Sequence, residues 1–549
     1  MNGMMDRRFV LKAGTMGLAA LAVPGIGPDI ARAFERMSGF THGVASGEPQ
    51  PASVLLWTRY VGSGDSKLDI ELSDSADFAN ARQAGSTVAR AERDFTAKAV
   101  VRDLQPNRWY FYRFVAPDGS TSCVGRTRTL PVGDVARFGL GVFSCSNLPF
   151  GHFNAYAHAA ERQDLDLVLH LGDYLYEYPV GTYPSLEQAL PGRVIQPDTE
   201  MLTLADYRLR YAAYRADPDL ARLHQSFPML AMWDDHEITN DAWKNGAQNH
   251  QPDEGDYQAR RLIAERVYRE WMPVRDLDDG GDLWAAYDIG QLATIIMTES
   301  RLAGRDQQVD LADAFAGEGE LAAKLAAFRD DIWMDPGRSM LGEKQGRWLS
   351  QTFAASKAGG TTWQVWGQQC VMGSLKLPPE AMGWVPANAP DYVRNRTLGG
   401  VAASQAGLPF NMDSWDGYPV ARAAHLTAAM EGNSDLIVLS GDSHNGWAFD
   451  LDVDGRAAGV EFATHSVSSP GFESYTPGVS PKDVTSALMR TNDQLTWADT
   501  SHRGYMTVTL TPEMAEAEWL GLETIRERST NMVMNQKHRV MAGANRISA

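Results

Sequence analysis

Short apolar runs recur along the chain, and their spacing changes after its first quarter. Between residues 38 and 132 these runs are separated by turn residues, a pattern that predicts strands at 53–58, 68–72, 97–101 and 109–115. Short strands at this spacing are typical of an all-β sandwich. We therefore predict a small N-terminal β-sandwich domain at 38–132 that contributes no site residues and acts as a structural cover or spacer.

Beyond Gly133 apolar runs alternate with helical stretches. Apolar segments at 138–143 and 165–171 enclose a helical stretch at 154–161, and further strand candidates follow at 229–233, 292–297, 361–366 and 436–439. Strands that alternate with helices indicate an α/β layered domain, here at 134–549. Two inserts, at 181–220 and 304–349, are long enough to form a lid or rim.

The N-terminus has the organisation of an export signal. Arg7, Arg8 and Lys12 precede an apolar stretch at 13–26 and a small-x-small cleavage motif at 31–33. The paired arginines resemble a bacterial twin-arginine signal, with a Sec-type signal or an uncleaved anchor as the alternative. We predict a signal peptide at 1–33, the twin-arginine export machinery as a partner, and a periplasmic or secreted protein with no stable membrane span in its mature form.

Charge narrows the range of partners. The 549 residues carry a formal net charge of -19, which argues against nucleic acid or an anionic membrane as the main partner. An acidic chain that handles phosphate has to neutralise it locally, and metal ions held by its carboxylates would do so. The three cysteines are too few for a disulfide scaffold.

Polar clusters follow four of the predicted strands. An isolated Asp or His at a strand end most often caps a helix or bonds within its loop. Ligands of α/β sheets, however, bind at the carboxyl ends of strands, so four clusters that face a common crevice indicate a site. The clusters lie at 144–147, 172–176, 234–237 and 440–445.

These residue types suit phosphate ester hydrolysis. The reaction needs a hydroxide nucleophile and stabilisation of the attacking and leaving oxygens, which two metal ions about 3.5–4 Å apart supply. Asp173 is the candidate carboxylate bridge. The thiol of Cys145 and the phenol of Tyr176 favour a transition metal, whereas carboxylates favour calcium, magnesium or manganese. Tyr174 is the competing phenol, although a packing role is expected for it.

Three motifs together resemble the PhoD family of alkaline phosphatases, which is related to the purple acid phosphatases. They are Gly172-Asp173-x-x-Tyr176, the block at 233–237 and the block at 441–444, and the segment 464–471 is similar to a late family signature. The resemblance implies a layered β-sandwich metallophosphoesterase core with helices, preceded by the small sandwich. It also implies an exported, metal-dependent alkaline phosphatase or phosphodiesterase that hydrolyses small phosphate mono- or diesters by a metal-activated hydroxide.

The resemblance further implies a set of site residues. A ferric ion would be held by Cys145, Asp173, Tyr176 and His444, and one or two calcium ions by Asp173, Asp235 and Asp442. His236 would donate a proton to the leaving group, and Arg301 would orient the phosphate. Glu299 and Gln368 stand where the family pattern differs and are left as outer candidates, together with Asn240, for which turn capping is an equal alternative.

Two other functions remain open. A phospholipase D-like diesterase would use the same site on a phospholipid headgroup or a teichoic-acid-like polymer. A secreted binding module would use calcium only to stabilise loops. His236 argues against the second, because calcium loops have no use for an imidazole and a structural metal site is closed.

Overall fold

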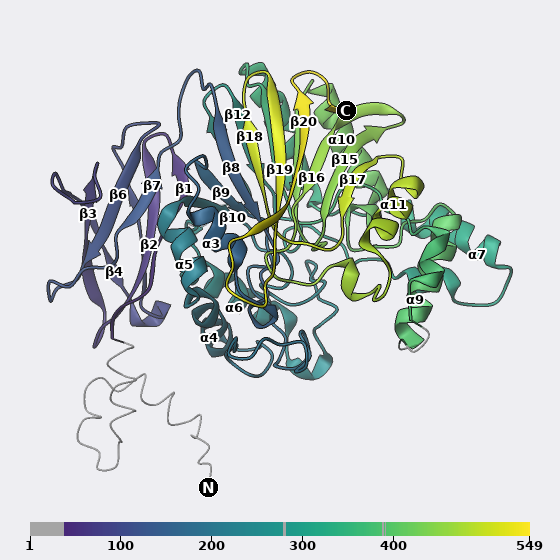
Figure 1. The fold of residues 1–549 in the computed structure, drawn as a ribbon, viewed down its shortest axis with the longest axis horizontal. Helices are drawn as coiled ribbons and strands as arrows, with labels where there is room; N and C mark the ends of the chain where they lie inside the picture. Colours follow the sequence, from purple (N-terminus) through teal and green to yellow (C-terminus); the bar gives the residue numbers. More distant parts are fainter. Residues whose placement is uncertain (1–37, 278–281, 387–388, 390, 549) are drawn as a thin grey trace, which may run out of the picture.

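The computed structural model describes residues 38–277, 282–386, 389 and 391–548. The predicted signal peptide at 1–33 lies outside these residues. Strands form sheets of ten, seven and four members, and the two large sheets lie together at the centre of the molecule (Figure 1). Among the described residues, no helix combines the length and the apolar character needed to cross a membrane.

The ten-stranded sheet has four parallel strands at its centre, in the order β8, β9, β10 and β1. Strands from the C-terminal part of the chain extend it on one side, and strands from the N-terminal part extend it on the other. Its members, in sheet order, are β21 (Ile547–Ser548), β20 (Met532–Met541), β19 (Met514–Leu522), β18 (Arg503–Leu510), β8 (Phe138–Phe143), β9 (Leu167–His170), β10 (Pro228–Ala231), β1 (Gly39–Gln50), β2 (Ser53–Val61) and β5 (Thr96–Val101).

The seven-stranded sheet packs against it. Apolar side chains from both sheets, such as Leu140 and Leu169 from one and Val365 and Leu439 from the other, form a single buried cluster. The apolar runs expected at 292–297, 361–366 and 436–439 are confirmed as strands of this sheet. Its members, in sheet order, are β11 (Ala285–Ile289), β12 (Ala293–Met297), β13 (Trp363–Gly367), β14 (Asp435–Ser440), β16 (Arg456–Ala463), β15 (Gly446–Val453) and β17 (Leu495–Asp499).

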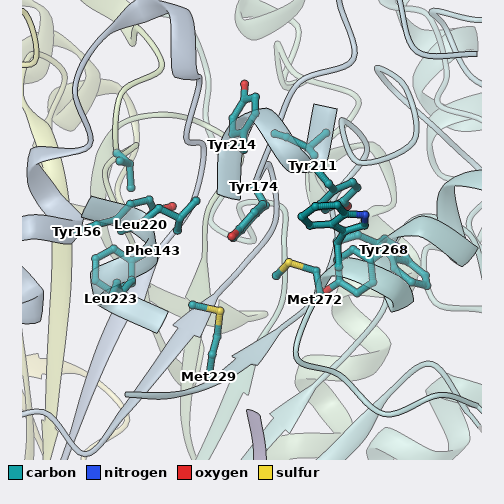
Figure 2. Packing of buried hydrophobic residues seen from close by; sticks show 14 of the residues in the cluster. Phe143, Tyr156, Tyr174, Tyr211, Tyr214, Leu220, Leu223, Met229, Tyr268 and Met272 are labelled. Atoms are coloured by element: carbon teal, nitrogen blue, oxygen red, sulfur yellow. The ribbon is translucent and has the colours of Figure 1, made fainter. Parts of the chain in front are cut away.

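Helices cover the outer faces of both sheets. An aromatic cluster that includes Tyr174, Tyr211, Tyr214 and Tyr268 packs between the ten-stranded sheet and its helices (Figure 2). These helices are α3 (Asn154–Ala160), α4 (Leu204–Arg215), α5 (Pro218–Ser226) and α6 (Tyr257–Trp271). A second cluster unites the seven-stranded sheet with α8 (Gly342–Ala358), α10 (Pro419–Glu431) and α11 (Pro481–Thr491). The short helix α7 (Leu321–Ala327) and α9 (Asp391–Gln405) project at the side farthest from the sandwich (Figure 1).

The N-terminal sandwich is present, and the four strands predicted for it are confirmed as β2, β3, β5 and β6. Its second sheet consists of β4 (Arg82–Ala89), β3 (Ser66–Ser73), β6 (Trp109–Val115) and β7 (Gly125–Arg128).

The sequence pattern missed β1, whose glycines and proline are typical of turns. This strand pairs in parallel with β10, Ser46 opposite Pro228 and Gly47 opposite Met229, and so joins the sandwich to the main sheet. Gly47 is required there, because a Cβ atom would lie 1.9 Å from the Pro273 carbonyl oxygen.

Candidate metal centre

The loops after β8, β9 and β10 meet the loop after β14 at one end of the two large sheets. Potential ligand atoms of Cys145, Asp173 and His444 lie within 4.8 Å of one another, as do those of Asp173, Asp235 and His236. A further group of the same size combines Asp234, Asp235 and Asp442. Because Asp173 and Asp235 each belong to two groups, the groups form one continuous cluster.

The backbone at this end is strained. Four of the clustered residues have left-handed backbones, with φ values of 60° at Cys145, 53° at Asp173, 58° at Asp442 and 65° at His444. Such conformations cost about 1–3 kcal/mol each in residues with a side chain and concentrate at functional sites. A Cβ atom at Gly172 would lie 2.3 Å from that of Asp234, so the two loops touch. These left-handed residues turn the chain sharply after the strands, toward a shared centre.

One end of the cluster, the thiol-phenol group, consists of Cys145, Asp173, Tyr176 and His444. The Tyr176 hydroxyl lies 2.9 Å from Asp173 Oδ2 and 3.2 Å from His444 Nε2. His444 Nδ1 lies 2.7 Å from the Pro470 carbonyl oxygen, which can only accept a hydrogen bond. Nδ1 therefore carries the proton, and Nε2 presents its lone pair to the group, as a metal-binding histidine does.

Asp173 has an unsatisfied oxygen. The residue is 1% exposed, and among the described residues Oδ1 has no hydrogen-bond partner. Burial raises the pKa of Asp173 well above its usual range, and the carboxylates of Asp235 and Asp234 raise it further. Burial likewise raises the pKa of the Cys145 thiol. A cation would satisfy the orphan oxygen and favour both ionised forms, so this donor set fits a metal ion.

Glu237 fixes the two acidic loops relative to each other. Its carboxylate accepts hydrogen bonds from the backbone N–H groups of Asp173 at 3.1 Å, Tyr174 at 2.6 Å and Asp234 at 2.9 Å. These hydrogen bonds hold the loop after β9 against the loop after β10. The Tyr174 hydroxyl bonds to His224 Nε2 at 2.8 Å, and its ring lies in the aromatic cluster, so the expected packing role of Tyr174 is confirmed.

His236 lies beside the carboxylates. Its Nδ1 is 2.7 Å from Glu177 Oε2, and its ring centroid is 4.3 Å from that of Tyr176. Burial would lower the pKa of His236, but Asp235 and Glu177 raise it well above the ordinary value. These carboxylates favour the protonated form of the imidazole.

The other end of the cluster, the arginine group, consists of Arg301, Arg305, Asp234, Asp413 and Asp442. Arg301 is fully buried, and its guanidinium contacts Asp234, both oxygens of Asp413 at 2.8 Å and Asp442 at 3.3 Å. Arg305 also bonds to Asp413 at 2.6 Å. The guanidinium of Arg301, predicted to orient phosphate, is thus engaged by carboxylates of the protein itself.

The three outer candidates lie nearby, but their polar atoms are bonded elsewhere. Glu299 accepts hydrogen bonds from the Trp233 indole at 2.9 Å and from three backbone N–H groups, the closest at 2.6 Å. The Gln368 side-chain oxygen accepts from the Trp415 indole at 3.0 Å. The Asn240 side chain bonds to Gln248 at 3.0 Å. In the described part of the chain, the groups of His, Cys, Asp and Glu ligand atoms do not contain Glu299.

Sequence reasoning missed three members of the site. Cys370 forms a fourth ligand group with Asp413 and Asp442, and it could have been found because it lies just beyond the end of β13. Glu177 lies one residue beyond a motif that was inspected. No sequence pattern pointed to Asp413, because it lies in a loop remote from any predicted strand.

Two layered sheets with acidic loops and imidazoles gathered at one end define the metallophosphoesterase class of fold. The model of the PhoD-like phosphatase family matches residues 140–519, and the model of its N-terminal domain matches residues 28–131. Alkaline phosphatase D of Bacillus subtilis (strain 168) is 30% identical, over 96% of this chain and 86% of that protein. A solved structure of PhoD is 25% identical and superimposes with a TM-score of 0.75, covering 93% of this chain and 92% of the other.

The chain therefore belongs to the PhoD-like phosphatase family, and it is a phosphoric ester hydrolase.

Proposed function

We propose that the protein is an exported, metal-dependent alkaline phosphatase and phosphodiesterase, with a ferric ion and one or two calcium ions at the clustered strand ends. The observation that supports this most strongly is the buried, unsatisfied Oδ1 of Asp173 between two groups of ligand atoms. Asp173 would then be shared by neighbouring metal ions, as a bridging carboxylate requires.

The thiol-phenol group would hold the ferric ion, because a thiol, a phenol and an imidazole are electron-rich donors that suit a transition metal. Asp173, Asp235 and Asp442 would hold calcium through their oxygens. When bound, the metal ions would neutralise the phosphate and activate the attacking water.

His236 acts as the general acid in this proposal. Its imidazole lies beside the shared carboxylates of Asp173 and Asp235, where the leaving oxygen of a bound ester would emerge. Transfer of its proton to that oxygen prevents a free alkoxide from forming.

Arg301, which contacts Asp234, Asp413 and Asp442, would orient the phosphate from this end of the cluster. This internal charge lets an acidic region accept a phosphate anion.

The proposal also covers the organisation of the chain. Residues 1–33 would serve as a twin-arginine signal, 38–132 as the N-terminal β-sandwich domain and 134–549 as the catalytic domain, which gives a periplasmic or secreted enzyme. Replacement of Arg7 and Arg8 by lysine should then retain the protein inside the cell. Normal export of that variant would remove the twin-arginine assignment.

The direct test is hydrolysis of nitrophenyl phosphate and bis(nitrophenyl) phosphate at alkaline pH, before and after chelation. We expect both esters to release nitrophenol, activity to disappear with the metal, and iron together with calcium to restore it. Full activity of a protein shown by elemental analysis to be free of metal would refute the proposal.

A further inference from the structure

We propose that a cavity between α8 and the hairpin of β11 and β12 binds a neutral oligosaccharide. The cavity has a volume of about 520 Å³, which lies within the range of about 300–1,000 Å³ that is typical of small-molecule sites. Its lining comes from both strands of the hairpin, the turn between them and α8. The cavity would be a second site, whose ligand depends neither on the metal ions nor on the proposed hydrolysis.

The cavity lies far from the metal centre. Thr294, near the start of β12, and Ser356, in the last turn of α8, both line it. The first turn of the same helix lies near the metal centre, where the Gln345 side chain donates a hydrogen bond to the Glu299 carbonyl oxygen at 2.7 Å. Gln345 and Ser356 are separated by about three turns, or roughly 16 Å of helix. A ligand in the cavity would therefore leave the catalytic end of the sheets uncovered.

A chain of hydrogen bonds forms the floor of the cavity. Gln364 donates to Ser356 Oγ at 3.0 Å, and Ser356 donates to Thr294 Oγ1 at 2.8 Å. Thr294 in turn donates to Asp288 Oδ1 at 2.9 Å. The first three of these residues are buried, whereas Asp288 is exposed. Because every donor points toward the carboxylate, the hydroxyls keep an acceptor lone pair and Asp288 keeps an oxygen for the hydroxyl groups of a ligand.

This polar floor interrupts an otherwise apolar layer. Side chains two residues apart on a strand share a face, so Thr294 lies on the same face as Ile296, and Gln364 on the same face as Trp366. Ile296 and Trp366 pack with α8 in an apolar cluster. The face therefore changes from apolar to polar toward the cavity. Packing alone would favour apolar residues throughout, whereas a network of fixed hydroxyls is oriented before a ligand binds.

The rest of the lining suits a sugar. Trp348 is partly buried at the cavity, and the exposed amides of Gln291 and Gln351 border it. An indole can stack on the C–H face of a sugar ring, while amides and a carboxylate bond to its hydroxyl groups. Among the described residues that line the cavity, Trp348 is the one aromatic side chain, and there is no lysine or arginine. The cavity thus offers neither the cations that bind a phosphate nor the aromatic cage that binds a quaternary ammonium ion.

Isothermal titration calorimetry of the metal-loaded protein tests the proposal, with cellobiose, maltose and N,N′-diacetylchitobiose as probes. We expect at least one of these sugars to bind with a Kd of about 1 mM or less. Choline chloride and inorganic phosphate are titrated as the competing classes of ligand, and saturating phosphate should leave the affinity for the sugar unchanged. Absence of sugar binding at millimolar concentration, or displacement of the sugar by choline, would overturn the proposal.

Three substitutions test whether the sugar lies in the cavity. A355F fills the cavity from an exposed position of α8, D288A removes the carboxylate, and W348A removes the indole. Each should weaken sugar binding about tenfold or more. E343A is the matched control for D288A, because Glu343 is an exposed carboxylate in the first turn of α8 and does not line the cavity. It should bind the sugar as the wild type does.

Hydrolysis of nitrophenyl phosphate separates a local effect from a damaged fold. All four variants should keep the wild-type kcat and KM, because none of the substituted residues contacts the metal centre. Loss of sugar binding with unchanged hydrolysis supports the proposal. Should W348A not fold, A355F and D288A decide the question, since both positions are exposed. Sugar binding that survives A355F and D288A would place the sugar elsewhere and overturn the proposal.

Discussion

The two ends of the acidic cluster differ in how a carboxylate at each end, Asp413 or Asp173, is neutralised. In the arginine group, Arg301 and Arg305 hold the pKa of Asp413 below its usual range although burial opposes them. In the thiol-phenol group no arginine or lysine contacts Asp173 within the described chain, and burial raises its pKa well above the usual range. At the first end two arginines supply the counter-charge of Asp413, whereas at the second end Asp173 Oδ1 has no hydrogen-bond partner among the described residues. Each end should therefore respond differently when a charge is removed.

The largest effect is expected from D173N. A neutral amide is a poor bridge between two cations, so turnover should fall to background and the protein should contain less metal. Elemental analysis and nitrophenyl phosphate hydrolysis check this together. A variant that kept its metals and full activity would show that Asp173 is not shared between metal ions.

D413N should chiefly affect stability. It removes the shared counterion of two buried arginines, and breaking a buried ion pair costs about 3–5 kcal/mol. Urea denaturation of the metal-loaded variant measures this loss. Since the folded pKa of Asp413 is depressed, its contribution exists above the unfolded pKa and vanishes as the pH falls. A loss of metal without a loss of stability would reverse the comparison between the two ends.

Removal of the metal by a chelator should give stability a pH dependence opposite to the one that Asp413 confers. With a raised folded pKa, Asp173 stabilises the metal-free protein only at low pH, and that stability is lost as the pH rises through the folded pKa. The chelated protein should therefore lose stability as the pH rises above the ordinary carboxyl pKa of about 4, by at most about 1.4 kcal/mol per pH unit for each such group. Melting temperatures of the loaded and chelated proteins test this, and parallel curves would contradict it.

The smallest effect is expected from the replacement of Tyr176 by phenylalanine, and it concerns the visible absorption spectrum. A phenolate bound to ferric iron absorbs visible light, so Y176F should bleach the protein and weaken its preference for iron. Y174F is the matched control, because its hydroxyl bonds to His224 within the core, and it should keep the colour at a cost of about 1 kcal/mol. A colourless, fully active native enzyme would rule out the ferric ion.

The sequence predicted those parts of the fold and site that follow from local pattern. Apolar runs located the central strands, and inspection of strand ends located Asp173, Asp235 and His444, because the residue after a buried strand is fixed by the strand itself. Asp413 could not be found in this way. Its position depends on a loop that packs two arginines far away in sequence, and only the folded chain brings them together.

The pairing of β8 with β18 has a consequence for folding. One hydrogen-bonded sheet contains strands that begin at Gly39 and strands that reach Met541 and beyond, so its central strands acquire their last neighbours only after almost the entire chain has been synthesised. Contacts of such long sequence separation slow folding. Formation of the catalytic end is thus postponed until synthesis is nearly complete, and a chain truncated before β18 would leave β8 as an unpaired edge prone to aggregation.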